Sequence, residues 1–121
     1  IDNGVEKDGY YRDAAETYPV GKLTDELDSL IKVTRESLLT GINNAANRSR
    51  IKDVSSAIYE YADNRGFGVV RQYCGHGVGF SLHEEPQISN YPGNSDNQRL
   101  KAGMVLAIEP MLNIGCWEVD V

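Results

Sequence analysis

Residues 76–86 read HGVGFSLHEEP, and this stretch says more about fold and chemistry than any other part of the chain. It contains both histidines of the sequence, His76 and His83, which lie seven residues apart, with glycines on either side of the first. Glycine permits close backbone approaches that a Cβ would forbid. A histidine framed by glycines after an apolar strand, predicted over Phe67 to Tyr73, is therefore expected to point into a functional site. The alternative is a pair of structural histidines.

Carboxylates at predicted strand ends could combine with these histidines to form a metal site. Asp2 and Asp13 flank a turn predicted at Lys7-Asp8-Gly9, so an antiparallel hairpin would bring both to one end of the site. Glu109 closes the apolar stretch that begins at Met104, and a buried ionised carboxylate is costly unless it is paired or binds a metal. Three carboxylates and an imidazole suit Mn, Fe, Co or Zn. Because carboxylates can bridge two ions, the residues predict a two-metal hydrolytic centre, with ordinary solvated carboxylates as the alternative.

Three stretches of sequence occur in a recognisable order: IDNG with KDGYYRDAA, then YCGHGVGFSLHEEPQISNY, then LKAGMVLAIEPMLNIG. Through them the chain resembles the methionine aminopeptidases, specifically the type I branch, over essentially all of its 121 residues. The resemblance implies an α+β pita-bread fold (creatinase/aminopeptidase-like), incomplete at both ends. It also implies one partial metallopeptidase catalytic domain over residues 1–121, with the end of the first half at about 1–22 and most of the second half at about 23–121.

The resemblance implies two divalent metal ions (Co, Mn, Fe or Zn) and a role for each ligand. Asp2 would bind one ion and Asp13 would bridge both. His76 and Glu109 would bind the second ion, and Glu109 would also carry the proton of the attacking water. Cys74, two residues before His76, is the alternative thiolate ligand.

Two further residues are assigned to the substrate by the same resemblance. His83 is not expected to be a ligand and would hydrogen-bond to the scissile peptide during catalysis. Leu82 would line the apolar pocket for the methionine side chain, with ordinary core packing as its alternative. The implied reaction is removal of N-terminal methionine from peptides and nascent proteins. The alternatives are an Xaa-Pro aminopeptidase or prolidase of the same fold, and a non-catalytic peptide-binding relative; CGHG and the Met-Leu-Asn after Glu-Pro favour the first reading.

The family's upstream histidine and its last bridging glutamate have no counterpart among the 121 residues. We therefore expect the sequence to be a middle segment of an enzyme, and residues 1–121 alone to be inactive. The formal net charge of −6 argues against a nucleic-acid partner bound through its phosphates. The two cysteines predict no disulfide framework, and we find no apolar run long enough for a membrane and no signal segment. We expect a cytoplasmic enzyme, monomeric when complete, that acts on nascent chains near the ribosome.

The remaining sequence predicts two helices between the hairpin (residues 1–20) and the histidine segment. Thr24 is expected to cap the first helix, whose apolar stripe should face inward. That stripe consists of Leu27, Leu30, Ile31, Leu38 and Ile42. The second helix is expected from about Arg50 to Arg65, with Gly66 ending it. Its inward residues are Val54, Ala57, Ile58 and Tyr61.

Three strands and one long loop complete the prediction. Besides Phe67 to Tyr73, strands are expected around His83 and from Met104 to Glu109. The Gly/Asn/Ser/Asp-rich stretch from Tyr91 to Arg99 predicts a loop, which we expect to be the least ordered part of the chain.

Overall fold

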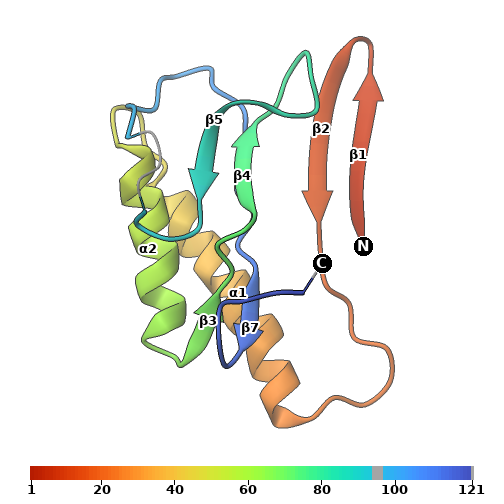
Figure 1. Ribbon diagram of the computed structural model, residues 1–121. Coiled ribbons are helices and arrows are strands. Elements are labelled where there is room, and N and C mark those ends of the chain that lie inside the picture. Colours follow the sequence, from red (N-terminus) through yellow and green to blue (C-terminus); the bar gives the residue numbers. More distant parts are fainter. Residues whose placement is uncertain (94–96, 121) are drawn as a thin grey trace.

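A β-hairpin stands beside a layer of short strands backed by two helices in the computed structural model, which describes residues 1–93 and 97–120 (Figure 1). The elements run in chain order as β1 (Asp2–Lys7), β2 (Tyr10–Ala15), α1 (Asp25–Asn44), α2 (Ile51–Asp63), β3 (Phe67–Val69), β4 (Cys74–Gly77), β5 (Glu84–Ser89), β6 (Leu106–Ala107) and β7 (Leu112–Ile114). In the described part of the chain, neither helix is long and apolar enough to cross a membrane.

Three antiparallel sheets organise the strands. β1 pairs with β2, β3 pairs with β7, and β4 lies between β5 and β6. The two helices contact each other, α2 contacts β3 and β5, and α1 contacts β7. The helices therefore cover one side of the strands, and the hairpin lies on the other side of β4 from β5 (Figure 1).

The hairpin has the predicted position and turn. Asp8 and Gly9 both have positive φ, 56° and 80°, as a two-residue turn between strands of right-handed twist requires. The register sets Asp2 opposite Ala15 and Gly4 opposite Asp13. Because side chains two residues apart on a strand share a face, Asp2 and Asp13 lie diagonally on one face of the hairpin.

The second helix agrees closely with its prediction, and it carries much of the core. It runs from Ile51 to Asp63, and Gly66 follows with φ 80°. Val54 and Ile58 are buried as predicted, while Ala57 and Tyr61 are only half-buried. The buried cluster consists of Ile51, Val54, Ile58, Ile88 and Leu100.

The first helix begins as predicted, but its fully buried residues are not the predicted ones. The Leu27 N–H donates to Thr24 Oγ1 at 3.3 Å, which confirms the cap. The predicted apolar stripe is wrong at its two ends, where Leu27 and Ile42 are 41% and 48% exposed, whereas Leu30, Ile31 and Leu38 are half-buried. The buried residues are instead Val33, Ser37 and Gly41.

The full burial of Ser37 and Gly41 reflects a close approach between the helices. A Cβ at Gly41 would lie 2.7 Å from Ile58 Cγ1, so only a residue without a side chain fits where α1 meets α2. The fully buried Ser37 satisfies its hydroxyl locally by donating to the Thr34 carbonyl oxygen at 2.7 Å. Small residues at this contact bring the helices together, and Leu27 and Ile42 remain exposed.

The strand predictions were correct in place and too long in extent. The strand predicted from Phe67 to Tyr73 is correct only up to Val69, where β3 ends, and His76 lies inside a separate strand, β4. β5 begins one residue after His83, and β6 covers only two residues of the stretch predicted up to Glu109. β7 was not predicted. Residues 94–96 of the predicted loop lie outside the described residues.

Candidate metal centre

Glycines on both sides of His76 let β5 and β6 approach β4 closely. A Cβ at Gly75 would collide with the carbonyl oxygen of Ala107, and one at Gly77 would collide with that of Glu85. His76 itself pairs with Ala107 on one side and with Gln87 on the other. The sheet therefore holds the His76 backbone from both edges, and the residue as a whole is only 7% exposed.

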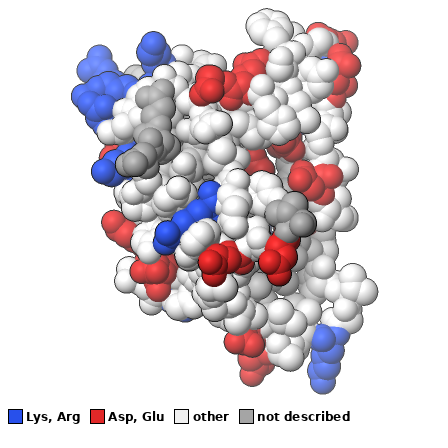
Figure 2. All heavy atoms as spheres, in the orientation of Figure 1, with Lys and Arg blue, Asp and Glu red and all other residues white. Residues whose placement is uncertain are grey.

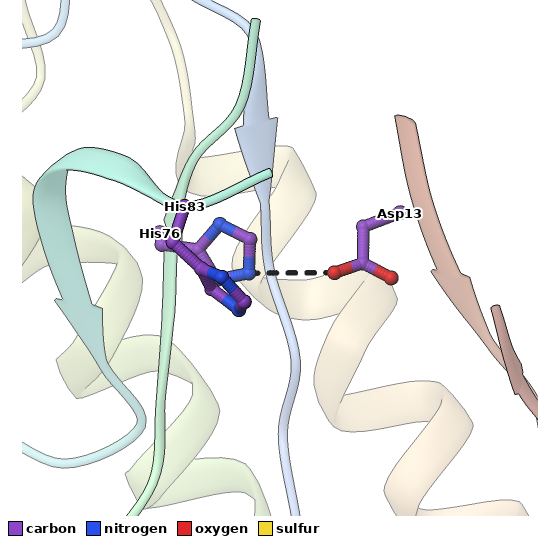
Figure 3. Close-up of side chains that lie close together, drawn as sticks. All are labelled: Asp13, His76 and His83. Atoms are coloured by element: carbon purple, nitrogen blue, oxygen red, sulfur yellow. Dashed lines mark ion pairs between the residues drawn. The ribbon is translucent and has the colours of Figure 1, made fainter. Parts of the chain in front are cut away.

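The orientation of the His76 ring is fixed by one hydrogen bond. Nδ1 lies 2.8 Å from the Gly77 carbonyl oxygen, which can only accept, so Nδ1 carries a proton and donates. Nε2 lies 3.1 Å from Glu109 Oε1. It also lies 3.5 Å from Asp13 Oδ2, a contact that Figure 3 marks with a dashed line. The second ring nitrogen thus faces two carboxylates, one from the hairpin strand β2 and one from the segment that follows β6.

Three groups with lone pairs meet at this point when His76 is neutral. Nε2 of His76, Oδ2 of Asp13 and Oε1 of Glu109 would repel one another unless a proton on Nε2 or a cation lies among them. Glu109 Oε1 is buried and has no hydrogen-bond partner in the described structure. An orphaned carboxylate oxygen next to an imidazole and a second carboxylate fits a divalent cation, and the donor set suits Mn, Fe, Co or Zn.

His83 lies against His76 at the open side of the site. The ring centroids are 4.3 Å apart with the planes tilted by 53°, and both rings face Asp13 across the gap (Figure 3). Ligand atoms of Asp13, His76 and His83 lie within 4.8 Å of one another, although the sequence prediction gave His83 no ligand role. His83 is exposed whereas His76 is buried, so the two histidines have different access to solvent.

Glu109 is the group whose acidity the site changes most clearly. Burial is the main cause of its raised pKa, and the nearby His76 opposes that effect. The negative charges of Asp13 and Asp2 raise the pKa further. Asp2 thus influences the site electrostatically, although it is exposed and makes neither of the ion pairs with His76.

The remaining predicted residues lie around this centre. Leu82 is half-buried and lies against Gly4 of β1, where an added Cβ would be 3.0 Å from Leu82 Cδ1. Cys74 is half-buried, and burial followed by the charge of Glu109 raises the pKa of its thiol, which disfavours the thiolate that a metal would need. In the metal-free protein the Cys74 thiol is therefore held in its neutral form.

Sequence analysis missed Asn90. This residue is fully buried, and its Nδ2 donates to the Glu109 carbonyl oxygen at 2.8 Å. The sequence signal for it was weak, because an asparagine after a strand usually marks a turn.

Negative charge surrounds the hairpin side of the molecule. Figure 2 shows acidic side chains on that side and also on the left and at the bottom of the same face, while many of the Lys and Arg side chains in view gather at the upper left. A concentration of one sign of charge raises the local concentration of counter-ions. The surface near the site therefore favours the approach of cations.

Comparison with known proteins gives consistent matches. Residues 1–120 match the family model described as metallopeptidase family M24. Methionine aminopeptidase 1 of Bacillus subtilis is 50% identical over 115 residues, which are 95% of this chain and 46% of that protein. The chain spans about half the length of the curated relatives it matches.

Solved structures agree with these matches. Methionine aminopeptidase from Thermotoga maritima is similar with a TM-score of 0.94 and 46% identity, over 99% of this chain and 48% of that chain. The prolidase from Pyrococcus furiosus is similar with a TM-score of 0.76 and 32% identity, over 91% of this chain and 32% of that chain. These neighbours have the pita-bread fold, which confirms the predicted fold class.

Proposed function

Because the chain belongs to metallopeptidase family M24, we propose that it supplies the metal-binding part of an enzyme that removes N-terminal methionine from peptides and nascent proteins. The relatives named methionine aminopeptidase, at 40–50% identity, support this substrate. Membership of this family implies a divalent metal. We further propose that residues 1–22 and 23–121 belong to the two halves of one catalytic domain, and that the protein acts as a cytoplasmic monomer near the ribosome.

The observation that carries the proposal is the meeting of Asp13, His76 and Glu109 around one point. His76 would offer Nε2, and the two carboxylates would offer Oδ2 and Oε1, at separations of 3.1–3.5 Å from that nitrogen. With Asp2 on the same face of the hairpin, these residues would hold two divalent ions, drawn from Co, Mn, Fe or Zn. Bound ions of this kind lower the pKa of a water and polarise a carbonyl, which is the chemistry that peptide hydrolysis needs.

The protein's own groups have separate tasks in this proposal. Glu109, with its raised pKa, would accept the proton of the attacking water and pass it to the leaving amine. His83, exposed beside His76, would donate a hydrogen bond to the scissile peptide. Leu82, between the histidines and the hairpin, would contact the methionine side chain.

The test compares two peptides with the full-length protein after metal removal and reconstitution with Mn²⁺ or Co²⁺. A Met-Ala peptide should be cleaved faster than an Ala-Pro peptide. His76→Ala should lose bound metal and turnover together, whereas the exposed Cys116→Ser should keep both. Faster cleavage of Ala-Pro would assign the chain to the Xaa-Pro or prolidase branch, which the similarity to the prolidase keeps as the second candidate. Metal binding without cleavage of either peptide would indicate the peptide-binding alternative.

A further inference from the structure

The side chain of Asn90 joins the two outer strands of the sheet that contains His76. β5 and β6 both run antiparallel to the central β4, so they run in the same direction and end at the same edge. Asn90 directly follows β5, and Glu109 follows β6 by two residues. The hydrogen bond of 2.8 Å from Asn90 Nδ2 to the Glu109 carbonyl oxygen therefore spans the start of β4.

The direction of this hydrogen bond is determined by the acceptor. A carbonyl oxygen can only accept, so the amide NH₂ must face Glu109, and the opposite amide orientation would set two oxygens against each other. Asn90 Oδ1 then points elsewhere, where it is buried and has no partner in the described structure. Leaving a buried acceptor unpaired is unfavourable. An aliphatic residue of similar shape would avoid that penalty, so packing alone does not explain an amide at this fully buried position.

What the amide does provide is a fixed backbone at Glu109. Pro110 follows Glu109 and has no N–H, so the chain loses one donor that could anchor this turn to its neighbours. Asn90 supplies an anchor from the far side of the sheet. Fixing the Glu109 carbonyl also fixes its Cα, and with it the direction in which the carboxylate reaches His76 Nε2 at 3.1 Å.

We propose that Asn90 is a positioning residue, which holds the Glu109 backbone so that the carboxylate lies where the metal binds. The proposal rests on the metal site of the proposed function. Groups that orient metal ligands through hydrogen bonds typically contribute about 10–100-fold to metal affinity. Asn90 acts on the ion only through Glu109, and its effect should therefore disappear when the Glu109 carboxylate is absent.

The experiment titrates the metal-free, full-length protein with Co²⁺ or Mn²⁺ and follows the visible Co²⁺ spectrum and the binding heat. Asn90→Leu keeps the shape and removes the donor; it should weaken metal binding by about 10–100-fold while the Tm of the metal-free protein changes little. The control is Ile88→Val, two residues before Asn90 in β5. It should lower the Tm and leave metal affinity unchanged. In a Glu109→Gln background, Asn90→Leu should have little further effect on affinity.

Two results would overturn the proposal. One is an Asn90→Leu protein, or an Asn90→Ser protein if the leucine variant does not fold, that binds Co²⁺ as tightly as the wild type with the same spectrum. The other is an Ile88→Val protein whose affinity falls in parallel with its Tm, which would reduce Asn90 to a structural role. Failure of the wild-type protein to bind either metal would instead contradict the proposed function, so the two failures are distinguishable.

Discussion

At His76 a single hydrogen bond determines what the site can hold. Nδ1 donates to the Gly77 carbonyl oxygen, which leaves Nε2 as the nitrogen directed toward Asp13 and Glu109. A histidine that uses Nε2 for a metal commonly has its other nitrogen hydrogen-bonded in this way. The backbone of β4 thus selects the tautomer that a metal site requires.

Replacing Glu109 by glutamine tests whether turnover depends on the charge of this side chain rather than on its size. Glu109→Gln keeps the side-chain shape but replaces the carboxylate by a neutral amide. The variant therefore loses the negative charge that would bind the metal and the group that would accept the proton. Turnover of a Met-Ala peptide is expected to fall by about 10²–10⁴-fold, the range for loss of a general acid–base group. The control is Glu85→Gln on β5, where the side chain is exposed and should be replaceable without effect. Steady-state kinetics at saturating metal measures both, and equal activity of the two variants would contradict a role for Glu109.

The raised pKa of Glu109 predicts a pH dependence of stability in the metal-free protein. The folded state binds the Glu109 proton more tightly than the unfolded chain, whose carboxyl titrates near 4.5. The free energy of unfolding should therefore fall as pH rises from about 4.5 through the raised pKa, and this part of the dependence should level off above it. Thermal unfolding in the presence of a chelator, compared with Glu109→Gln, isolates this contribution. Parallel pH profiles for the two proteins would show that burial does not act on Glu109 as proposed.

At the residue scale the sequence singled out several residues that lie close together in the structure. Asp13, His76, His83 and Glu109 were chosen from residue type, glycine context and family resemblance, and the structure brings them together. Asn90 could not be predicted, because its importance comes from a hydrogen bond across a sheet whose register no local pattern specifies. Such long-range contacts depend on tertiary pairing rather than on neighbouring residues.

Among the elements, β4 depends most strictly on glycine. Gly75→Ala would drive a Cβ into the Ala107 carbonyl oxygen, part of the β6 backbone. The nearby Gly79→Ala is the matched control, because its Cβ would meet only the flexible Glu84 carboxylate, at 3.2 Å. We expect Gly75→Ala to lower the free energy of unfolding by about 1–3 kcal/mol or more, and Gly79→Ala to cost less. Denaturant unfolding measures the difference, and equal losses would mean that β6 can move away without penalty.

The hairpin should depend on the metal for its order. An isolated two-stranded hairpin is marginal in water. Its links to the histidine segment include a hydrogen bond of 2.7 Å from the Tyr11 N–H to the Gly79 carbonyl oxygen and a stack of Tyr10 on Phe80 at 5.0 Å. A metal held by Asp13 and His76 would add a strong further link. Hydrogen exchange of β1 and β2 amides should slow on addition of Mn²⁺, and Asp13→Asn should abolish that slowing without changing exchange in α2.

Element types were easier to predict than element faces. The Asp8-Gly9 turn and the Thr24 cap are local, and both were predicted correctly. The fully buried residues of α1 were not predicted: the aliphatic stripe is buried only in part, and the small Gly41 lies at the close contact with Ile58. A helix–helix contact formed by small residues does not produce a stripe of large apolar residues in the sequence.

For the whole molecule, the amount of exposed surface is informative. The fold exposes 8054 Å², whereas a compact monomer of 13.4 kDa exposes about 6,500 Å². Part of the excess is apolar: Val20, Ile1 and Phe80 are 95%, 78% and 75% exposed. Apolar surface of this extent favours association with other protein surface.

A polypeptide made of residues 1–121 alone is therefore expected to self-associate and to show little aminopeptidase activity. The chain spans about half the length of its curated relatives, and the hairpin that carries Asp2 and Asp13 is exposed over most of its length. Loosely held ligands cannot fix two ions at a constant separation, so metal binding should be weak. Light scattering should find assemblies larger than 13.4 kDa, and activity on a Met-Ala peptide with Co²⁺ or Mn²⁺ should be far below that of the full-length protein. A monodisperse monomer with turnover within about tenfold, a difference of only ~1.4 kcal/mol in transition-state stabilisation, would contradict this prediction, because it would mean that the described residues hold the site without further support.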